Sequence, residues 1–477
     1  MYKGATQGHK SVRRGFPERV SLYVLLVVVT LAPLPFGSKD LWIIAGWNVA
    51  LAVSLLFLPL HRLGSVHLGL LVTLAIFCVA WAVAIHEQIS LQPWIARHLA
   101  NPIWDDTSRL LGLPVAPAVA ISKNQPLLAL GAPLAAIMSL VCGFVLGQDR
   151  KAARMIFLAI AVSGAVYAAY GITSFAIDPT TMLGRQKEAY QSVLTATFVN
   201  RNTAATYFGS CAILWLLLLS NQVRRYAAQR SIDREAVKRV FRNPSTKILV
   251  PLAAFVMVVL AMFMTGSRAG VLLSLAALTI AFLSYFHRDL DSRSAWLLVI
   301  GGIATLVFAT WQVMGSGIAE RIEQQGFVDS GRTSVYRSTF AIVRDFPWLG
   351  TGLGTFAWIF PAYRSSDLSS WGIWDRAHDT LLEIASDLGI PAAALVLLGW
   401  MILVAVLFRG VRTRQRDRMF PAAGSAVALL SGLHSLVDFP LQVPGYAIVA
   451  FAIIGTGLAQ SHEIHVERVG IRSNKPC

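Results

Sequence analysis

The stretch KILVPLAAFVMVVLAMFMT at residues 247–265 decides the class of fold. It carries no charged residue after Lys247, and a bilayer-spanning helix needs roughly 20 mainly apolar residues. Apolar runs of this kind recur along the whole chain. Hydrophobic residues make up 55% of the sequence and charged residues only 14%, whereas soluble domains usually contain about 25% charged residues. The sequence therefore predicts an all-α, polytopic integral membrane protein.

We predict about twelve transmembrane helices in a single membrane domain covering residues 1–477. They are expected at roughly 20–36, 41–60, 67–86, 127–148, 153–177, 203–222, 247–265, 269–287, 295–314, 384–408, 420–436 and 444–460. The first span follows a basic stretch, as a signal peptide would. No small-residue cleavage site ends it, so we expect a retained helix.

Lysine and arginine residues set the predicted orientation, because short cytoplasmic loops of membrane proteins are enriched in them. With the N-terminus inside the cell, the cytoplasmic segments hold most of the 41 basic residues. The segments 224–247 and 409–418 contribute most strongly. We therefore expect a multi-pass protein with both termini in the cytoplasm. The same distribution explains the net charge of +16 without nucleic acid as a partner.

Two predicted outer segments are too long to be simple turns. One covers residues 87–126, and the larger one covers 315–383, between the ninth and tenth spans. Loops longer than about 15 residues are usually functional. Within the larger segment, residues 333–344 have helical periodicity, and the glycine-rich stretch 347–354 interrupts it. We expect a small helical cap over the membrane domain there.

Three outer stretches combine charged residues with Gly or Asn at the ends of apolar runs, namely TFVNRN at 197–202, TGSRAG at 265–270 and RAHD at 376–379. They place Arg201, Arg268 and His378 at one membrane face. An arginine at a membrane boundary often only extends its side chain to the interface. Here Gly266 and Gly270 flank Arg268, so the backbone can approach a ligand closely. Two guanidinium groups also match the oxygens of a phosphate or diphosphate headgroup.

His378 is the candidate general base, because an ordinary imidazole titrates near neutral pH. Asp379 and Glu383 follow it and could orient the ring. Another pair, His434 and Asp438, lies in HSLVDFPLQVP at 434–444. These two residues are four apart and would share one face of a helical turn. They would either hold the helix end together or support the same outer site.

No cofactor and no metal ion are expected. The sequence GTGLG at 350–354 resembles part of a dinucleotide-binding loop but lacks the strand and helix that such a loop joins. Asp289 and Asp291 resemble a metal-binding pair, but the predicted topology places them on the cytoplasmic side. Asp105 and Asp106 lie outside without a nearby His or Glu.

These motifs resemble the O-antigen ligase and polymerase superfamily of bacterial membrane glycosyltransferases. The resemblance rests on TFVNRN (197–202), TGSRAG (265–270), GR…FPWLGTGLGTF (331–356), AHDTLLEIASDLGIP (377–391) and HSLVDFPLQVP (434–444). The motifs follow one another in the order of the family and cover roughly residues 197–444.

The resemblance implies a GT-C-like fold in the bacterial inner membrane. It also implies inverting, metal-independent glycosyl transfer on the periplasmic face from a glycan on undecaprenyl diphosphate. Arg201 and Arg268 would bind the diphosphate, and His378 would activate the acceptor hydroxyl. Arg332 and Arg376 are further candidates to support this site.

One residue departs from the family pattern. The family usually has Asn directly after the histidine, whereas this chain has Asp379. A carboxylate beside the ring would change its titration by charge proximity. We therefore expect a different pH range or a different acceptor.

Within the superfamily, the reaction could polymerise a surface polysaccharide or exopolysaccharide, or it could ligate a finished glycan to lipid A core. The ending HSLVDFPLQVP is more similar to the polymerase branch. A lipid-linked-glycan flippase or other transporter is the alternative of a different class. Transporters often place ionisable residues near the membrane midplane, whereas the middles of these spans are almost free of charge. The expected partners are the lipid-linked donor, a glycan or lipid A core acceptor, and membrane lipid.

Overall fold

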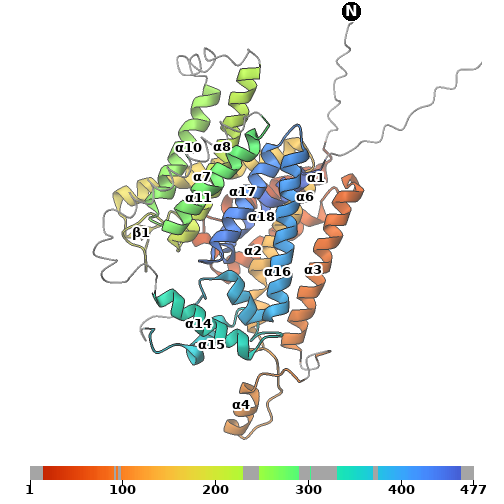
Figure 1. Cartoon of the computed structure of the whole chain (residues 1–477), viewed down its shortest axis with the longest axis vertical. Helices are drawn as coiled ribbons and strands as arrows, with labels where there is room; N and C mark the ends of the chain where they lie inside the picture. Colours follow the sequence, from red (N-terminus) through yellow and green to blue (C-terminus); the bar gives the residue numbers. More distant parts are fainter. Residues whose placement is uncertain are drawn as a thin grey trace, which may run out of the picture.

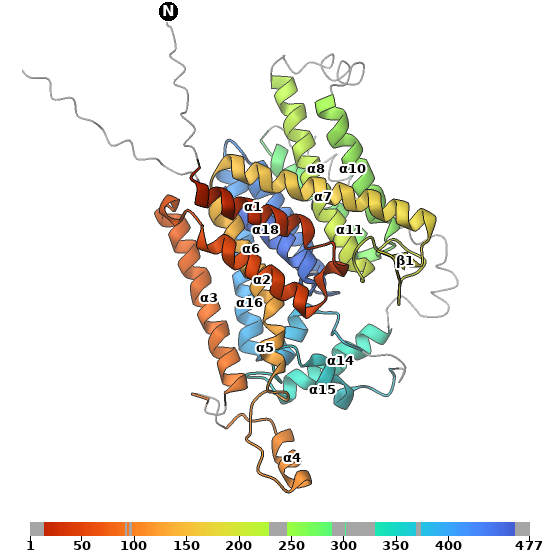
Figure 2. The ribbon, with the colours of Figure 1, turned by 180° about the vertical axis from the view of Figure 1, so that it is seen from behind.

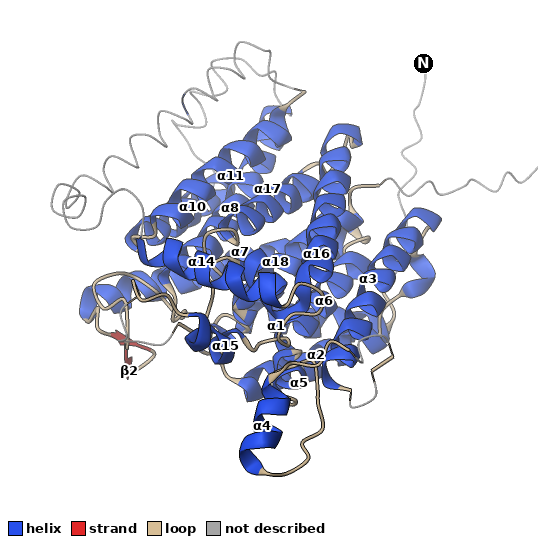
Figure 3. Cartoon of the chain, turned by 60° about the horizontal axis from the view of Figure 1, so that its bottom comes forward, coloured by secondary structure: helices blue, strands red, loops and turns tan. Residues whose placement is uncertain are grey.

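The computed structural model describes residues 14–90, 93–94, 98–228, 246–288, 301, 330–368 and 374–462. Within these residues the chain is almost entirely helical (Figure 3), which confirms the predicted class. A small antiparallel hairpin joins β1 (Thr181–Met182) to β2 (Arg185–Gln186).

The long apolar helices follow the predicted spans closely. They are α1 (Phe16–Leu31), α2 (Leu41–Leu56), α3 (Ser65–Ile89), α6 (Gly131–Leu146), α7 (Arg150–Ile177), α8 (Arg201–Ala228), α10 (Thr246–Met264), α11 (Arg268–Phe286), α16 (Thr380–Thr413), α17 (Met419–His434) and α18 (Pro444–Ala459). The shorter elements are α4 (Ile103–Leu111), α5 (Gln125–Ala129), α14 (Ser330–Asp345), α15 (Phe356–Tyr363), η1 (Phe36–Ser38), η2 (Leu60–Arg62) and η3 (Pro440–Gln442). The predicted span at 295–314 lies outside the described residues.

The number of membrane crossings is confirmed in part. Within the described ranges, seven helical segments are long and apolar enough to cross a membrane. Helices α2, α17 and α18 are apolar but only 16 residues long. Such a helix is about 24 Å long, against about 30 Å for the hydrocarbon core. The multi-pass helical architecture is therefore established, while the count of twelve and the GT-C-like arrangement stay predictions.

Small residues allow the central helices to pack closely, as is common in membrane proteins. At the contact of α6 with α18, a Cβ on Gly143 would lie 2.7 Å from the carbonyl oxygen of Ala452. A Cβ on Gly455 would lie 2.2 Å from the carbonyl oxygen of Leu140. Helix α8 is also central, with 89% of its apolar stretch buried, whereas α3 is peripheral with 6% buried. Figure 1 shows α3 at the edge of the bundle beside α16.

Helices α14 and α15 lie together at one end of the bundle, which we call the α14 end (Figures 1 and 2). Helix α14 confirms the helix predicted at 333–344. Helix α4, from the other long predicted outer segment, lies at the same end. The start of α1 and the end of α18 lie at the opposite end. The described parts of both long outer segments are therefore on one side of the bundle.

Helix α16 is broken near its start. Gly389 has non-helical dihedral angles (φ 84°, ψ 167°), and Pro391 follows it inside the helix. Proline has no backbone N–H, so it also removes a helical hydrogen bond. The break separates a short first piece, residues 380–388, from the long apolar helix that follows.

The break frees backbone carbonyl groups that find partners elsewhere. The carbonyl of Ser386 accepts the Thr351 N–H at 2.9 Å, and the carbonyl of Asp387 accepts the Gly352 N–H at 3.0 Å. The Gln88 side-chain amide also donates to the Asp387 carbonyl, at 2.7 Å. Irregular backbone at membrane depth is tolerated where protein groups satisfy it. The glycine-rich segment after α14 is therefore fixed against the first piece of α16.

The break predicts that Gly389→Ala will destabilise the protein. Its positive φ disfavours any side chain, and a Cβ there would lie 2.2 Å from the carbonyl oxygen of Trp348. Strain of this kind costs about 1–3 kcal/mol, which thermal unfolding in detergent will show as a lower melting temperature. The control is Gly69→Ala on α3, where a Cβ would have no neighbour within 4 Å. Equal melting temperatures for the two variants would contradict this account of the break.

Candidate functional site

Three helices begin close together at the α14 end. Helix α8 begins at Arg201, α11 at Arg268 and α16 at Thr380. The hydroxyl of Ser267 donates to the side-chain oxygen of Asn202 at 2.7 Å, which joins the first two starts. Helix N-termini carry partial positive charge and free N–H groups, so they favour anions. The arrangement suits an anionic group.

The residue before each start caps its helix. The side chains of Asn200, Ser267 and Asp379 accept backbone N–H groups at 2.6, 3.2 and 3.0 Å. Asp379 was a sequence candidate for orienting His378, but the structure turns its carboxylate into the first turn of α16. An Asp directly before an apolar run is a common helix cap, and this signal was present in the sequence.

His378 is held between an acidic group and two aromatic rings. Its Nδ1 lies 3.4 Å from Oδ1 of Asp438, and its side chain is 19% exposed. The rings of Phe439 and Trp374 lie edge-on, with centroids 5.1 and 5.6 Å from that of the imidazole. The hydroxyl of Tyr336 donates to the His378 backbone carbonyl at 3.0 Å. Because Nδ1 faces the carboxylate, Nε2 is the ring nitrogen that remains for a substrate.

The carboxylate of Asp438 is the buried centre of this arrangement. One oxygen accepts the side-chain amide of Asn202, and the other accepts the Phe439 N–H at 2.8 Å. Burial works to raise the pKa of Asp438. The hydrogen bond and charge of His378, the charge of His434 and the Phe439 N–H outweigh burial and hold this pKa below its usual range. Asp438 is therefore ionised near neutral pH.

Asn202 was not among the candidates chosen from the sequence. Its side chain accepts from Ser267 and donates to Asp438, so it bridges the start of α11 and the partner of His378. The signal was its position beside Arg201 in TFVNRN. A carboxamide is suited to this place because it can donate and accept at the same time.

His434 and Asp438 do not form the side-chain pair expected from their spacing. The Nδ1 of His434 lies 2.6 Å from the Thr206 hydroxyl. The hydrogen bond that joins these two residues runs through the backbone, from the Asp438 N–H to the His434 carbonyl at 2.9 Å. Helix α17 ends at His434, so Asp438 is free to turn toward Asn202 and His378. Of the two sequence interpretations, the structure favours support of the site.

The two arginines of the predicted diphosphate site lie at neighbouring helix starts. The guanidinium of Arg201 lies over the ring of Tyr190, 5.2 Å from its centroid. A Cβ on Gly266 would lie 3.9 Å from Nη1 of Arg201, so this arginine borders the turn into α11. Arg268 begins that helix and is exposed. Arg201 and Arg268 are thus the sequence neighbours of the bonded pair Asn202 and Ser267.

The other two candidate arginines have different surroundings. Arg332 donates to the backbone carbonyl of Val437 at 3.0 Å, directly before Asp438. Arg376 forms an ion pair with Glu383 at 3.1 Å. The other oxygen of Glu383 accepts the backbone N–H of the residue between Arg376 and His378, at 2.8 Å. Glu383 therefore fixes the segment before α16 and does not orient the imidazole.

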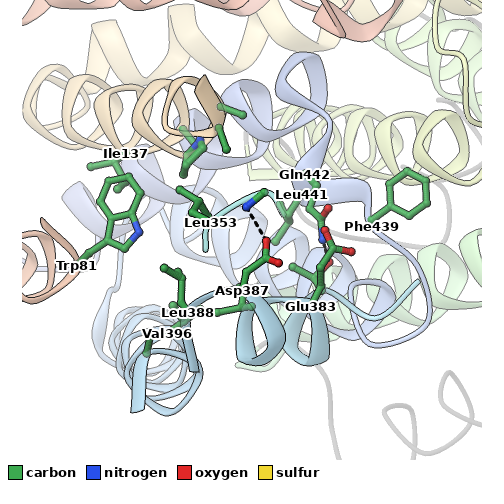
Figure 4. Close-up of a pocket in the computed structure, with 18 of the residues that line it drawn as sticks. Trp81, Ile137, Leu353, Glu383, Asp387, Leu388, Val396, Phe439, Leu441 and Gln442 are labelled. Atoms are coloured by element: carbon green, nitrogen blue, oxygen red, sulfur yellow. Dashed lines mark hydrogen bonds between the residues drawn. The ribbon is translucent and has the colours of Figure 1, made fainter. Parts of the chain in front are cut away.

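A cavity of about 1600 Å³ opens beside His378. Its polar part includes Tyr190, Asn200, Arg376 and Glu383. The rest of its wall is mainly apolar and comes from α3, α6 and α16, with Leu70, Phe77, Trp81, Leu140, Leu395 and Leu403 among its residues. Figure 4 shows Trp81, Ile137 and Val396 on one side of this space and Glu383, Gln442 and Phe439 on the other. The cavity can therefore hold a ligand with a polar head and a long apolar part.

Part of the chain matches a known protein family. Residues 253–397 match a family model described as O-antigen ligase. The chain carries an O-antigen ligase domain. The match contains Arg268, Arg332, Arg376 and His378, whereas Arg201 and Asp438 lie outside it. No curated protein matches the chain. The match confirms, over residues 253–397, the resemblance inferred from the motifs, and the long apolar helices fit a membrane protein.

The buried carboxylate of this ligase-family protein predicts a pH-dependent contribution to stability. Because the pKa of Asp438 is lowered in the folded state, its ionised form stabilises the fold above the pKa of an unfolded Asp. This contribution is lost as the pH falls through the lower, folded-state pKa. Asp438→Asn should therefore lower the melting temperature at about pH 7, and this difference should shrink as the pH falls below about 4, toward the folded-state pKa.

Thermal unfolding in detergent across this range checks the expectation. Asp105→Asn on α4 is the matched control, because Asp105 is exposed. A melting temperature difference between Asp438→Asn and the unsubstituted protein that stays constant from neutral to acid pH would refute the assignment.

Proposed function

We propose that this protein transfers a glycan from undecaprenyl diphosphate to an acceptor sugar hydroxyl on the periplasmic face of the inner membrane. The reaction would elongate a surface polysaccharide or exopolysaccharide, and transfer to lipid A core is the alternative within the family. The observation that carries the proposal is the contact of His378 with buried Asp438, beside the cavity and the helix starts of Arg201 and Arg268. The family match supports glycosyl transfer of this type.

The proposal assigns the α14 end to the periplasm and both termini to the cytoplasm. Residues 315–383 and 87–126 would then be the two periplasmic segments of a single membrane domain. The ion pairs of Arg14 with Asp149 and of Arg62 with Glu18 lie at the start of α1, which is at the opposite end of the bundle. Basic residues are favoured on the cytoplasmic side of a membrane, which supports this orientation.

The donor headgroup fits the positive region around the starts of α8 and α11. Arg201 and Arg268 supply guanidinium forks, which match diphosphate oxygens. The helix N-termini add N–H groups and partial positive charge. Arg332 brings a further positive charge to the vicinity of Asp438. Negative charge that develops on the leaving diphosphate would be stabilised by these fixed groups.

The apolar wall of the cavity fits a lipid-linked substrate. Most of α3 is not buried against the rest of the protein. The cavity is lined by residues of α3, α6 and α16, so it lies between α3 and the bundle. A polyprenyl chain can lie along Leu70, Phe77 and Leu140, whose apolar side chains match the hydrocarbon that it leaves. This placement keeps the reacting headgroup close to His378.

The proposed chemical step is a direct displacement. The acceptor hydroxyl gives its proton to Nε2 of His378 while its oxygen forms a bond to the anomeric carbon. The bond from this carbon to the diphosphate oxygen breaks, and its electron pair leaves with the diphosphate. Attack from the face opposite the leaving group inverts the configuration. The charged imidazole is stabilised by Asp438, and such contacts commonly shorten when substrate is bound.

The role of His378 gives a prediction for the native host. His378→Ala should lower turnover by about 100- to 10,000-fold, because general bases contribute rate factors of this size. The measurement compares surface glycans with undecaprenyl-linked precursors. His287→Ala is the matched control, since His287 is exposed at the other end of α11.

The products that accumulate separate the alternatives. Missing long chains together with intact lipid-linked single repeats would identify a polymerase. Long chains that remain on undecaprenyl diphosphate would identify a ligase. Precursor trapped on the cytoplasmic leaflet would indicate a flippase, and full activity of the His378→Ala variant would overturn the enzymatic proposal.

The arginines give a separate prediction for the purified protein. Arg201→Gln and Arg268→Gln should each lower kcat by about 100- to 1,000-fold, the usual effect of removing one group that stabilises developing charge. The Lys variants should be intermediate, because Lys keeps the charge but lacks the bidentate fork. Arg344→Gln on α14 is the control, with a side chain 74% exposed. Unchanged kcat in both Gln variants would remove the arginines from diphosphate binding.

A further inference from the structure

One carboxyl oxygen in the cavity wall takes no part in the proposed glycosyl transfer. Asp387 lies in the first piece of α16 and is 4% exposed. Its Oδ2 accepts the Gly354 N–H at 2.7 Å, as Figure 4 shows. Its Oδ1 is buried and has no hydrogen-bond partner among the described residues. Leaving a buried polar oxygen without a hydrogen bond is costly, so this oxygen is suited to a partner that enters the cavity.

The neighbouring charged groups are already engaged. Glu383 lies one helical turn before Asp387, and its two oxygens bind Arg376 and a backbone N–H. The backbone carbonyl of Asp387 accepts Gln88 and Gly352. These contacts fix the position of Asp387 without using Oδ1. The free oxygen therefore lies on a rigid part of the cavity wall.

The surroundings of Asp387 suit neither the polyprenyl tail nor the diphosphate of the donor. A polyprenyl tail has no group that would donate to Oδ1. A diphosphate would find no available positive partner there among the described residues, because the nearby Arg376 is already paired with Glu383. An uncharged ligand that carries O–H groups can donate to Oδ1 and needs no positive partner.

Aromatic side chains in the cavity wall also suit a sugar. Trp81, Trp348 and Trp358 also line the cavity, and the last two are 64% and 66% exposed. A sugar ring can place its C–H face on an indole while its hydroxyl groups donate to a carboxylate. A few well-placed polar groups in a largely apolar wall are typical of sites that fix the orientation of a ligand.

The distance from the reacting centre indicates which part of a glycan would lie here. Asp387 lies seven residues after Thr380, where α16 begins, roughly 10 Å along the helix at a rise of 1.5 Å per residue, and His378 lies two residues before that start. This is further than one sugar ring extends and within reach of a short oligosaccharide. The contact would therefore involve a sugar other than the one at the reacting bond.

We propose that Oδ1 of Asp387 anchors a sugar-binding subsite, where it accepts a hydroxyl group of a neutral sugar remote from the reacting carbon. This inference rests on the proposed glycosyl transfer. The sugar belongs either to the acceptor or to the lipid-linked donor, and kinetics with each substrate varied in turn distinguish the two.

The test uses the full chain in lipid nanodiscs and the variant Asp387→Asn. Asn keeps an oxygen for the Gly354 N–H and replaces Oδ1 by an amide nitrogen, which cannot accept a hydroxyl proton. The donor is undecaprenyl-diphosphate glycan extracted from host membranes, and the acceptor is oligosaccharide released from the host surface glycan. We expect KM to rise about tenfold for one substrate, since losing one hydrogen bond to a buried acceptor weakens binding by about that factor. We expect kcat to change less than threefold.

The control for a merely structural role is Thr351→Val. Thr351 anchors the same glycine-rich segment through its hydroxyl and the Ser386 carbonyl, but it is fully buried and does not line the cavity. A rise in the KM for the acceptor assigns the subsite to the acceptor, and a rise for the donor assigns it to the donor. An equal rise in the Thr351→Val variant would overturn the subsite.

The result for His378→Ala separates this inference from the proposed function. Loss of turnover in that variant, together with unchanged KM values in Asp387→Asn, would overturn the subsite and leave the proposed function intact. Full turnover in His378→Ala would overturn the proposed function itself, and a changed KM in Asp387→Asn would then still mark a sugar contact.

Discussion

The site depends on one buried negative charge. Asp438 is almost fully removed from solvent, and a carboxylate in such a place needs hydrogen bonds or opposite charge to remain ionised. Asn202, the Phe439 N–H and His378 provide these contacts. Because Asn202 is also bonded to Ser267, the same carboxylate fixes the starts of α8 and α11 relative to the imidazole. Loss of this charge would affect three helices at once.

The class of fold was readable from the sequence because its physical signal is local. A run such as 247–265 must avoid water over its whole length, and no distant residue changes that requirement. Helix α14 was also predictable, since its periodicity is contained within 333–344. The break in α16 was harder to predict from the sequence. Gly389 and Pro391 signal an interruption, but the amides that satisfy the freed carbonyls come from a segment before the helix.

Only some residues of the site could be predicted from the sequence, because part of the site is formed by segments that are distant along the chain. Arg201, Arg268 and His378 stood out because charges at the ends of apolar runs are unusual. The partner of His378 did not, since Asp438 is distant in sequence and its spacing from His434 indicated a local pair. Asp379 was assigned to the imidazole because it is adjacent, although an Asp before a helix more commonly caps it. A contact between distant segments decided the partner of His378, and a local helix cap decided the role of Asp379.

The position of Asp438 near the end of the chain has a consequence for biosynthesis. Membrane proteins are made from the N-terminus onward, and their earlier segments begin to fold before the later ones exist. A nascent chain that has reached the end of α16 already contains both arginines of the helix starts and His378. It lacks the carboxylate, so the amide of Asn202 has no acceptor and the imidazole has no counter-charge. The site becomes complete only when the segment between α17 and α18 is in place.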